Sequence, residues 1–169
     1  MSLSHGFPPV ADGSARVLVL GSLPGRASLE AGQYYAHKRN VFWRIMGDLI
    51  GAGPDVPYAQ RQEKLLAAGI ALWDVIAAGE RPGSLDADIV KDSVCANDFS
   101  AFFAVHRKIR QVFFNGGAAE AAFRRHALPG LQGANLQLVR LPSTSPAHAA
   151  SSYAEKLAAW SAIVAPVNK

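Results

Sequence analysis

Four short, largely apolar runs are spread along the chain. They occupy residues 15–21, 70–75, 111–115 and 136–141, and read ARVLVLG, IALWDV, QVFFN and LQLVRL. The first is a continuous apolar run that ends in Gly, which is typical of a strand buried on both faces, and the other three are expected to be strands as well. The segments between them carry apolar residues at helical spacing, so each crossover returns the chain to start the next strand on the same side. The pattern predicts an α/β fold, a three-layer α/β/α sandwich with a central four-stranded, mostly parallel sheet.

The helices expected between these strands have recognisable ends. Residues 41–50 show apolar side chains at helical spacing and follow Asn40, a residue type that favours helix N-caps. Gly69 follows the expected helix at 59–68, as a glycine at a helix C-terminus would. Further helices are expected at residues 98–108, 118–127 and 151–165.

The longest connection, at residues 21–43, follows the first predicted strand. In open α/β sheets, ligands bind beyond the carboxyl ends of the strands, where this connection would lie. It contains glycines that allow close approach, the flat rings of Tyr34 and Tyr35, and a His-Lys-Arg run at 37–39. A connection of this length without regular structure is uncommon unless it has a function. We therefore expect the binding site here.

The other strands should send their own loops to the same edge. The second predicted strand stops at Asp74, the third ends in Asn115, and the fourth runs into a polar segment at 142–148. Because parallel strands end at one edge, these loops are expected to converge with residues 21–43 on a single crevice. Such a crevice would combine amides, hydroxyls, aromatic rings and one carboxylate.

Length and composition favour one compact domain. The chain has 169 residues, half of them hydrophobic, and roughly 100–200 residues make one domain. We expect a flexible tail at 1–14, which shows no periodicity, and a single domain at 15–169. No apolar run approaches the ~20 residues of a membrane-spanning helix, and the N-terminus lacks a signal-peptide pattern, so we expect a cytoplasmic protein without membrane contact. Cys95 is the only cysteine, which excludes an internal disulfide, and no Cys or His spacing resembles a zinc site.

The chain is moderately basic. Seventeen Lys and Arg residues against thirteen Asp and Glu residues give a net charge of +4 and a pI near 9.5. An excess of this size is a weak indication of nucleic acid. The placement is more informative, because Arg26 and the run at 37–39 lie in the expected binding loop, where phosphates could be met. The later basic groups, at 107–110 and 124–126, fall near helix ends and fit a solvated face better.

Several common catalytic patterns are missing from this edge. The segment GSLPGRAS at 21–28 lacks the Gly-Lys-Ser/Thr of a P-loop and is not a G-x-G-x-x-G motif. Ser143 and His148 could form a hydrolase dyad, but the nucleophile elbow G-x-S-x-G is absent, which disfavours a serine hydrolase.

Several motifs, taken in order, resemble those of the uracil-DNA glycosylase superfamily. They read GS-LPG-x-x-S, YYAH-x-x-N-x-FW, GIALWDV with R-x-GSLD downstream, FFNG and LPSTSPAHA. They extend over about residues 17–160, and the match is closest to the hypoxanthine-DNA (deoxyinosine) glycosylase branch. The resemblance implies a monofunctional enzyme of base excision repair that flips a deaminated base out of double-stranded DNA and hydrolyses its N-glycosidic bond. It also implies a monomer with a uracil-DNA glycosylase-like fold and no metal or organic cofactor.

The resemblance assigns Asn40 as the catalytic residue, through the Asn of N-x-FW. We expect Asn40 to place the attacking water or to stabilise the sugar cation, and the alternative is that it only caps a helix. Two familiar groups are replaced. Other branches have a water-positioning Asn or Asp near Leu23 and a base-binding His where this chain has Leu141. The loss of that His weakens the case for strong uracil activity.

The base pocket is expected to contain Tyr35, Asp74, Ser22, Leu23 and Asn115. By the resemblance, Tyr35 stacks on the flipped base, a contact worth about 1–3 kcal/mol. Asp74 reads the base: as a carboxylate it would accept a ring N–H such as N1–H of hypoxanthine, and if neutral it would donate to a carbonyl. Tyr35 could instead be a core tyrosine, although Tyr34 is the one expected to face inward. Asp74 could cap a helix or pair with Arg81, and Asn115 could form a turn.

Contacts with the DNA backbone are expected from Arg26, Lys38, Arg39, Ser143, Thr144, Ser145 and His148. By the resemblance, residues 143–145 match a loop that grips phosphates and the minor groove through its hydroxyls and free N–H groups. His148 would touch a phosphate or help fill the gap left by the flipped base, unless it faces solvent.

The same residues are also compatible with three other functions. One is excision of uracil from mismatches. A second is a DNA-binding module of the same fold that has lost catalysis, since the usual loop Asn and His are both replaced. A third is a small α/β enzyme that acts on free nucleosides.

Overall fold

A four-stranded parallel sheet forms the centre of the protein. The computed structural model describes residues 3–81, 89–90, 93–147 and 150–165. The strand order is β3-β2-β6-β7, and each neighbouring pair is parallel. The strands are β2 (Val17–Gly21), β3 (Ile70–Asp74), β6 (Gln111–Asn115) and β7 (Gln137–Leu141). Gly21 pairs with Asp74, and Asn115 pairs with Leu141, so the strands end at one edge. The four predicted strands and their parallel arrangement are confirmed.

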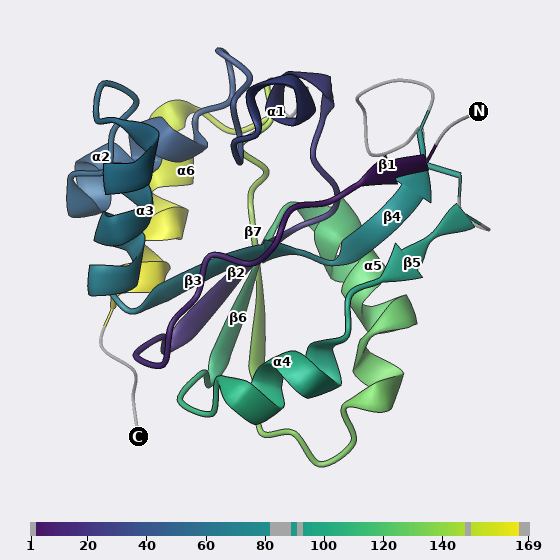
Figure 1. Ribbon diagram of the computed structural model, residues 1–169. Coiled ribbons are helices and arrows are strands. Elements are labelled where there is room, and N and C mark those ends of the chain that lie inside the picture. Colours follow the sequence, from purple (N-terminus) through teal and green to yellow (C-terminus); the bar gives the residue numbers. More distant parts are fainter. Residues whose placement is uncertain (1–2, 82–88, 91–92, 148–149, 166–169) are drawn as a thin grey trace.

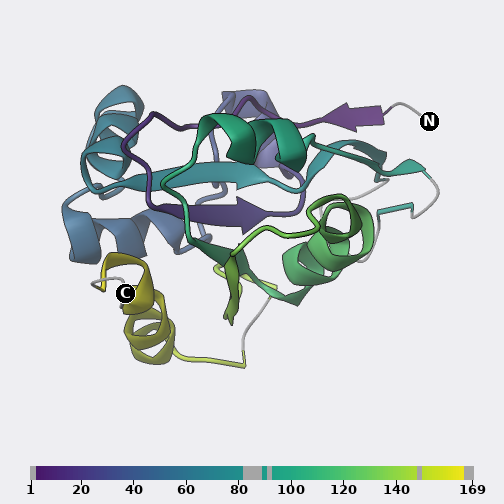
Figure 2. The same ribbon diagram turned by 90° about the horizontal axis from the view of Figure 1, so that it is seen from below.

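Helices cover both faces of this sheet, as the two views in Figure 1 and Figure 2 show. One face carries α2 (Phe42–Ile50), α3 (Tyr58–Ala67) and α6 (Tyr153–Trp160), and the other carries α4 (Phe99–Val105) and α5 (Gly117–His126). Val17 and Val19 of β2 belong to the core under α2, α3 and α6. Leu18 and Leu20 alternate with them and belong to the core under α4 and α5. The predicted three-layer sandwich is confirmed.

Two short 3-10 helices extend the fold after α5 and α6, and they are η3 (Leu128–Gly130) and η4 (Ser161–Val164). Within the described part of the chain, none of the helices combines the length and the apolar character that crossing a membrane requires.

A second, antiparallel sheet was not predicted from the sequence. Its order is β1-β4-β5, and its strands are β1 (Leu3–His5), β4 (Ile76–Glu80) and β5 (Cys95–Ala96). β4 follows β3 after one residue, Val75, whose N–H donates to Gly21 O at 2.8 Å. Strands this short contain too few residues to show a clear alternation of apolar and polar side chains.

The N-terminal segment at 1–14 was predicted to be a flexible tail, but its described residues pack on the domain. β1 pairs with β4, and Val10 exchanges two main-chain hydrogen bonds with Leu72. The indole Nε1 of Trp73 donates to Phe7 O at 3.1 Å. These contacts use main-chain atoms of the segment, which hydrophobic periodicity cannot detect. The described residues ahead of residue 15 thus contact both sheets.

The connection at 21–43 is less irregular than expected, because it contains the helix α1 (Arg26–Ala31). Gly32 closes this helix with a left-handed backbone at φ 66°. A helix of six residues is too short to show a helical repeat in the sequence. It lies above the carboxyl edge of the sheet (Figure 1).

Candidate active site

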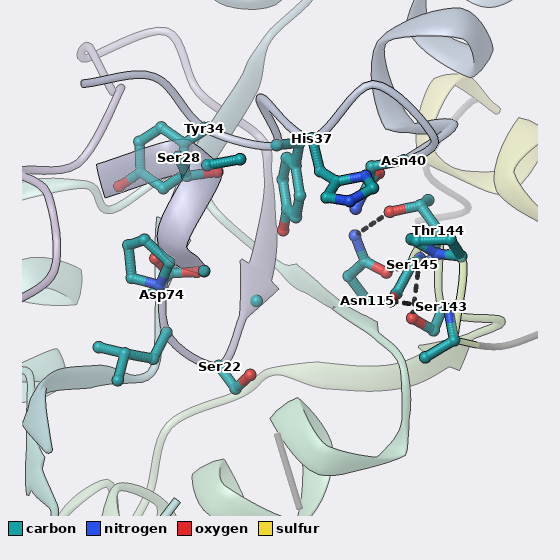
Figure 3. Close-up of a pocket in the computed structure, with 18 of the residues that line it drawn as sticks. Ser22, Ser28, Tyr34, His37, Asn40, Asp74, Asn115, Ser143, Thr144 and Ser145 are labelled. Carbon is teal, nitrogen blue, oxygen red and sulfur yellow. Dashed lines mark hydrogen bonds between the residues drawn. The ribbon is translucent and has the colours of Figure 1, made fainter. Parts of the chain in front are cut away.

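A cavity of about 670 Å³ opens at the carboxyl edge of the central sheet (Figure 3). Small-molecule sites typically measure roughly 300–1,000 Å³, so there is room for a planar base. The ends of β2, β3 and β6 and the segment that follows β7 contribute residues to it, as expected from parallel strands that end at one edge. The predicted residues that line it are Ser22, Leu23, Arg26, Tyr35, Arg39, Asn40, Asp74, Asn115, Ser143, Thr144 and Ser145.

Two predicted contacts are not among the lining residues. Lys38 is exposed and lies between His37 and Arg39, which do line the cavity. His148 lies outside the described residues. Ser28 also lines the cavity and was not predicted to do so, although it is the last residue of the motif LPG-x-x-S.

Gly21 forms the floor of the cavity at the end of β2. A Cβ atom on this residue would lie 2.6 Å from Asp74 Oδ1 and 2.7 Å from Tyr35 Oη. Distances this short do not occur between real atoms of this kind, so any other residue would displace the carboxylate, the phenol or both. Asp74 itself is only 3% exposed. The glycine therefore makes room for the carboxylate of Asp74 and the phenol of Tyr35, which both lie close to the space that a Cβ atom would occupy.

Tyr35 has a left-handed backbone. Its φ is 54°, and among the described non-glycine residues no other φ is positive. Such a conformation costs about 1–3 kcal/mol and is concentrated at functional sites. The ring packs on Phe42, with centroids 4.3 Å apart and planes tilted by 30°. α2 thus supports the ring from behind, while Tyr35 remains half-buried and lines the cavity. This arrangement favours a stacking residue over a core tyrosine.

Tyr34 faces inward, as expected. It is 3% exposed, and its hydroxyl donates to Pro8 O at 3.0 Å. Burial raises the pKa of this phenol well above its ordinary value, and the charge of Asp74 raises the pKa further. Tyr34 therefore stays protonated in the wall of the cavity and links that wall to the N-terminal segment.

Asn40 lies just before α2 and also lines the cavity. Its carboxamide Oδ1 accepts from the N–H of Phe42 at 3.0 Å, which satisfies one of the unpaired donors at the helix start. No other hydrogen bond of this side chain occurs among the described residues. The N-cap position of α2 is Val41 rather than the predicted Asn40, which stands one residue ahead and uses one lone pair of Oδ1 to accept from the first helical N–H. The second lone pair and the NH₂ group are left for chemistry in the cavity.

Asn115 bonds reciprocally with Thr144, as the dashed lines in Figure 3 show. Asn115 Nδ2 donates to Thr144 Oγ1, and Thr144 N–H donates to Asn115 Oδ1, both at 2.9 Å. Thr144 O in turn accepts from Val41 N–H at 3.1 Å. The end of β6, the segment after β7 and the start of α2 are thereby tied together. A base contact by Asn115 would have to use its second amide hydrogen or second lone pair.

The hydroxyl segment at 143–147 uses more of its N–H groups internally than predicted. Ser145 N–H donates to Ser143 Oγ at 3.1 Å, and Ala147 N–H donates to Ser145 Oγ at 3.2 Å. With Thr144 N–H engaged by Asn115, two of the N–H groups expected to be free, those of Thr144 and Ser145, already have partners. Because each serine oxygen accepts a bond, its own hydroxyl hydrogen remains available as a donor to an anion.

Arg81 supports the other wall of the cavity. Its guanidinium is buried and donates to the main-chain carbonyls of Leu23 and Pro24. A guanidinium presents several donors in a rigid fork, so two adjacent carbonyls can be held at once. This fixes the turn between β2 and α1.

Within the described residues, no group of three or more His, Cys, Asp and Glu side chains is placed to hold a metal ion. The side chains that line the cavity supply one carboxylate, amides, hydroxyls and aromatic rings, together with the cations of Arg26 and Arg39.

The fold and the cavity define a three-layer α/β protein with a nucleobase-sized site beyond its strand ends. The chain belongs to the uracil DNA glycosylase superfamily, whose family model matches residues 8–164. The resemblance inferred from the motifs is thereby confirmed.

Known relatives agree with this placement. A protein of Methanosarcina barkeri (strain Fusaro / DSM 804) named hypoxanthine DNA glycosylase is 42% identical over 113 residues, which are 66% of this chain and 70% of the relative. A protein of the same name from Methanosarcina acetivorans is 37% identical over 147 residues, which are 86% and 89% of the two chains. A solution NMR structure from M. acetivorans, provisionally named a uracil DNA glycosylase, has a TM-score of 0.80 and 35% identity, and the match covers 96% of this chain and 97% of that one.

Proposed function

We propose that this protein is a monofunctional DNA glycosylase of base excision repair that removes a deaminated base, hypoxanthine foremost, from double-stranded DNA. The observation that carries the proposal is that Asn40 and Tyr35, from the connection at 21–43, and Asp74, from the end of β3, line one cavity of nucleobase size. The family and the names of the two curated relatives support the same activity. The earlier expectation of a cytoplasmic monomer stays a prediction.

Tyr35 and Asp74 would recognise the base. The Tyr35 ring, supported by Phe42, offers a flat face for stacking, which contributes about 1–3 kcal/mol per base. The Asp74 carboxylate accepts a hydrogen bond from N1–H of hypoxanthine. Adenine carries a lone pair at N1, so it would leave a buried carboxylate facing an acceptor, and this mismatch would reject the normal base.

Asn40 would act on the reacting bond. Hydrolysis breaks the bond between C1′ of the sugar and N9 of the base, and the oxygen of a water molecule bonds to C1′. The base leaves with the electron pair and is protonated, which gives the free base and an abasic site. The lone pair of Asn40 Oδ1 that the Phe42 N–H does not use can hold the water or face the developing sugar cation.

The rim would bind the DNA backbone. Arg26 and Arg39 line the cavity mouth, and Lys38 is exposed beside them, so their charges can meet phosphates. The hydroxyls of Ser143 and Ser145 are oriented by the hydrogen bonds that they accept. Contacts of this kind position the duplex without reading its sequence.

Uracil in mismatches is the second candidate substrate. N3–H of uracil is also a donor, so Asp74 can accept from it as from hypoxanthine. The residue at position 141 is Leu, 4% exposed, and supplies no donor to a uracil oxygen. This favours hypoxanthine over uracil.

Nicking of labelled duplexes tests the proposal. Each duplex carries one inosine, uracil, xanthine or adenine at the same position, and alkali converts abasic sites into breaks. The expected result is breakage at inosine, weaker breakage at uracil and none at adenine. Binding of the inosine duplex without breakage would favour a module without catalysis, and cleavage of free nucleosides alone would favour the third function.

A further inference from the structure

We propose that Ser28 and Trp43 are positioning residues that hold Tyr35 in the conformation in which its ring receives a flipped base. The inference rests on the proposed function, in which Tyr35 is the stacking residue. Neither Ser28 nor Trp43 has to touch the substrate, because both act on the main chain next to Tyr35.

Each of the two peptide planes that flank Tyr35 is held by a side chain. In the plane before it, Tyr34 O accepts from the indole Nε1 of Trp43 at 2.7 Å. In the plane after it, Ala36 N–H donates to Ser28 Oγ at 3.1 Å. Because peptide units are planar, φ and ψ of Tyr35 are the rotations between these two planes and its Cα. Holding both planes therefore holds the left-handed φ of 54° that a residue with a Cβ rarely adopts.

The two anchors are themselves held. Ser28 is 6% exposed, and its carbonyl accepts from Gly32 N–H and Gln33 N–H, which closes the short helix α1. Trp43 is 3% exposed in α2, and the guanidinium of Arg61 lies 4.8 Å from its ring centroid. Thus α2 holds the peptide plane before Tyr35 through Trp43, and α1 holds the plane after it through Ser28.

The hydrogen bonds from Ser28 and Trp43 form a clamp on the main chain at Tyr35. This clamp decides where the Tyr35 ring lies. With the backbone held, the ring packs on Phe42 and the hydroxyl reaches the space above Gly21. If one anchor is lost, relaxation of φ toward negative values would carry the ring away from both contacts. A smaller fraction of the molecules would then have the Tyr35 ring in place to stack on the base, and the rate of excision would fall in proportion to that fraction. Binding of undamaged DNA, which depends on phosphate contacts, would not change.

The variant Ser28→Ala removes one oxygen atom from the clamp. We expect single-turnover excision of inosine to slow by about tenfold, while the Kd for undamaged duplex stays the same. Ser152→Ala is the matched control, because Ser152 Oγ accepts from a main-chain N–H in the same way, at 3.1 Å from Glu155, in α6. It should leave excision unchanged.

A double-mutant cycle separates action through Tyr35 from a general loss of structure. In a Tyr35→Ala background, Ser28→Ala should cause no further slowing. Additive slowing would overturn the proposal. Trp43→Phe keeps an aromatic ring but removes the donor to Tyr34 O, and it provides a second variant for the same cycle.

NMR of the Tyr35 ring provides a readout that does not need activity. Its ring protons experience the ring current of Phe42, so their shifts should change in Ser28→Ala and not in Ser152→Ala. If the protein does not excise inosine, the proposed function fails while this measurement still tests the clamp. Unchanged Tyr35 shifts in Ser28→Ala would overturn the positioning role.

Discussion

Asn115 and Thr144 exchange two hydrogen bonds of 2.9 Å, and through them the end of β6 holds the segment that carries the serine hydroxyls. Both residues are buried, at 8% and 1% exposure. The pair joins positions 29 residues apart in the chain. It shows how polar residues that look like ligand contacts in the sequence can instead build the wall of the cavity.

Thr144→Val should loosen this wall with little change in shape. The Asn115 Nδ2 group loses its acceptor while remaining buried, which costs about 1–3 kcal/mol in the free energy of unfolding. Urea denaturation measures the loss. Thr144→Ser keeps the hydroxyl and should stay close to the wild type, and equal stability of all three proteins would contradict the importance of this bond.

Asn40→Ala should abolish most of the excision activity. Loss of a placed polar group in an active site lowers kcat by roughly 10²–10³, and loss of the cap costs about 1 kcal/mol of stability. Asn40→Asp retains an acceptor for Phe42 N–H, so its stability should return to the wild-type value. Single-turnover excision and thermal unfolding of both variants are the measurements. Near-normal turnover by Asn40→Ala would leave Asn40 as a helix cap alone.

Gly21→Ala should abolish most of the excision activity by displacing two side chains of the site. The new methyl group would lie within 2.7 Å of Asp74 Oδ1 and Tyr35 Oη, so both must shift. A displacement of about 1 Å in an active site can reduce the rate about 100-fold. Gly13→Ala, with nothing within 4 Å of its Cβ position, is the control for a general Gly→Ala effect. Excision at the wild-type rate by Gly21→Ala would show that the two groups do not need this geometry.

Tyr34 should make stability fall at alkaline pH. In the unfolded chain a tyrosine ionises near pH 10, at about its reference pKa, whereas burial raises the pKa of Tyr34 in the folded protein. Unfolding then releases a proton above about pH 10, so the free energy of unfolding does not change below that pH on account of Tyr34 and falls above it. Urea denaturation between about pH 9 and about pH 11 should show a shallower fall for Tyr34→Phe than for the wild type. Identical slopes would contradict the raised pKa.

The centre of the sheet could be predicted because β2 is a continuous apolar run. Val17, Leu18, Val19 and Leu20 are all buried, and a run that is apolar at every position fits only a strand covered on both faces. Parallel connection then follows from the intervening helices, and with it the gathering of strand ends at one edge. Asp74 and Asn115 were placed at that edge by this reasoning.

The second sheet and the N-terminal segment could not be predicted in the same way. β1 has three residues and β5 has two, and their pairing depends on main-chain groups that every residue carries. The same holds for Val10, which bonds to Leu72 through its N–H and C=O groups. Hydrophobic periodicity contains no information about such contacts.

The detailed roles within the cavity were also beyond the sequence. Ser28 is the last residue of the motif LPG-x-x-S, yet the hydrogen bond that it accepts from Ala36 N–H depends on the turn that follows α1. Gly21 was expected to let a ligand approach the backbone, and in the structure it makes room for Asp74 and Tyr35.

The sequence by itself determined the four strands of the central sheet and their parallel direction, the edge at which the site would form, and the residue types that the site contains. These follow from local patterns, because burial of an apolar run and the direction of a crossover are properties of neighbouring residues. Only the tertiary structure decided which polar groups face the cavity and which are engaged with one another. A side chain such as that of Asn115 has the same hydrogen-bonding capacity in either role, and its partner is set by atoms far away in the chain.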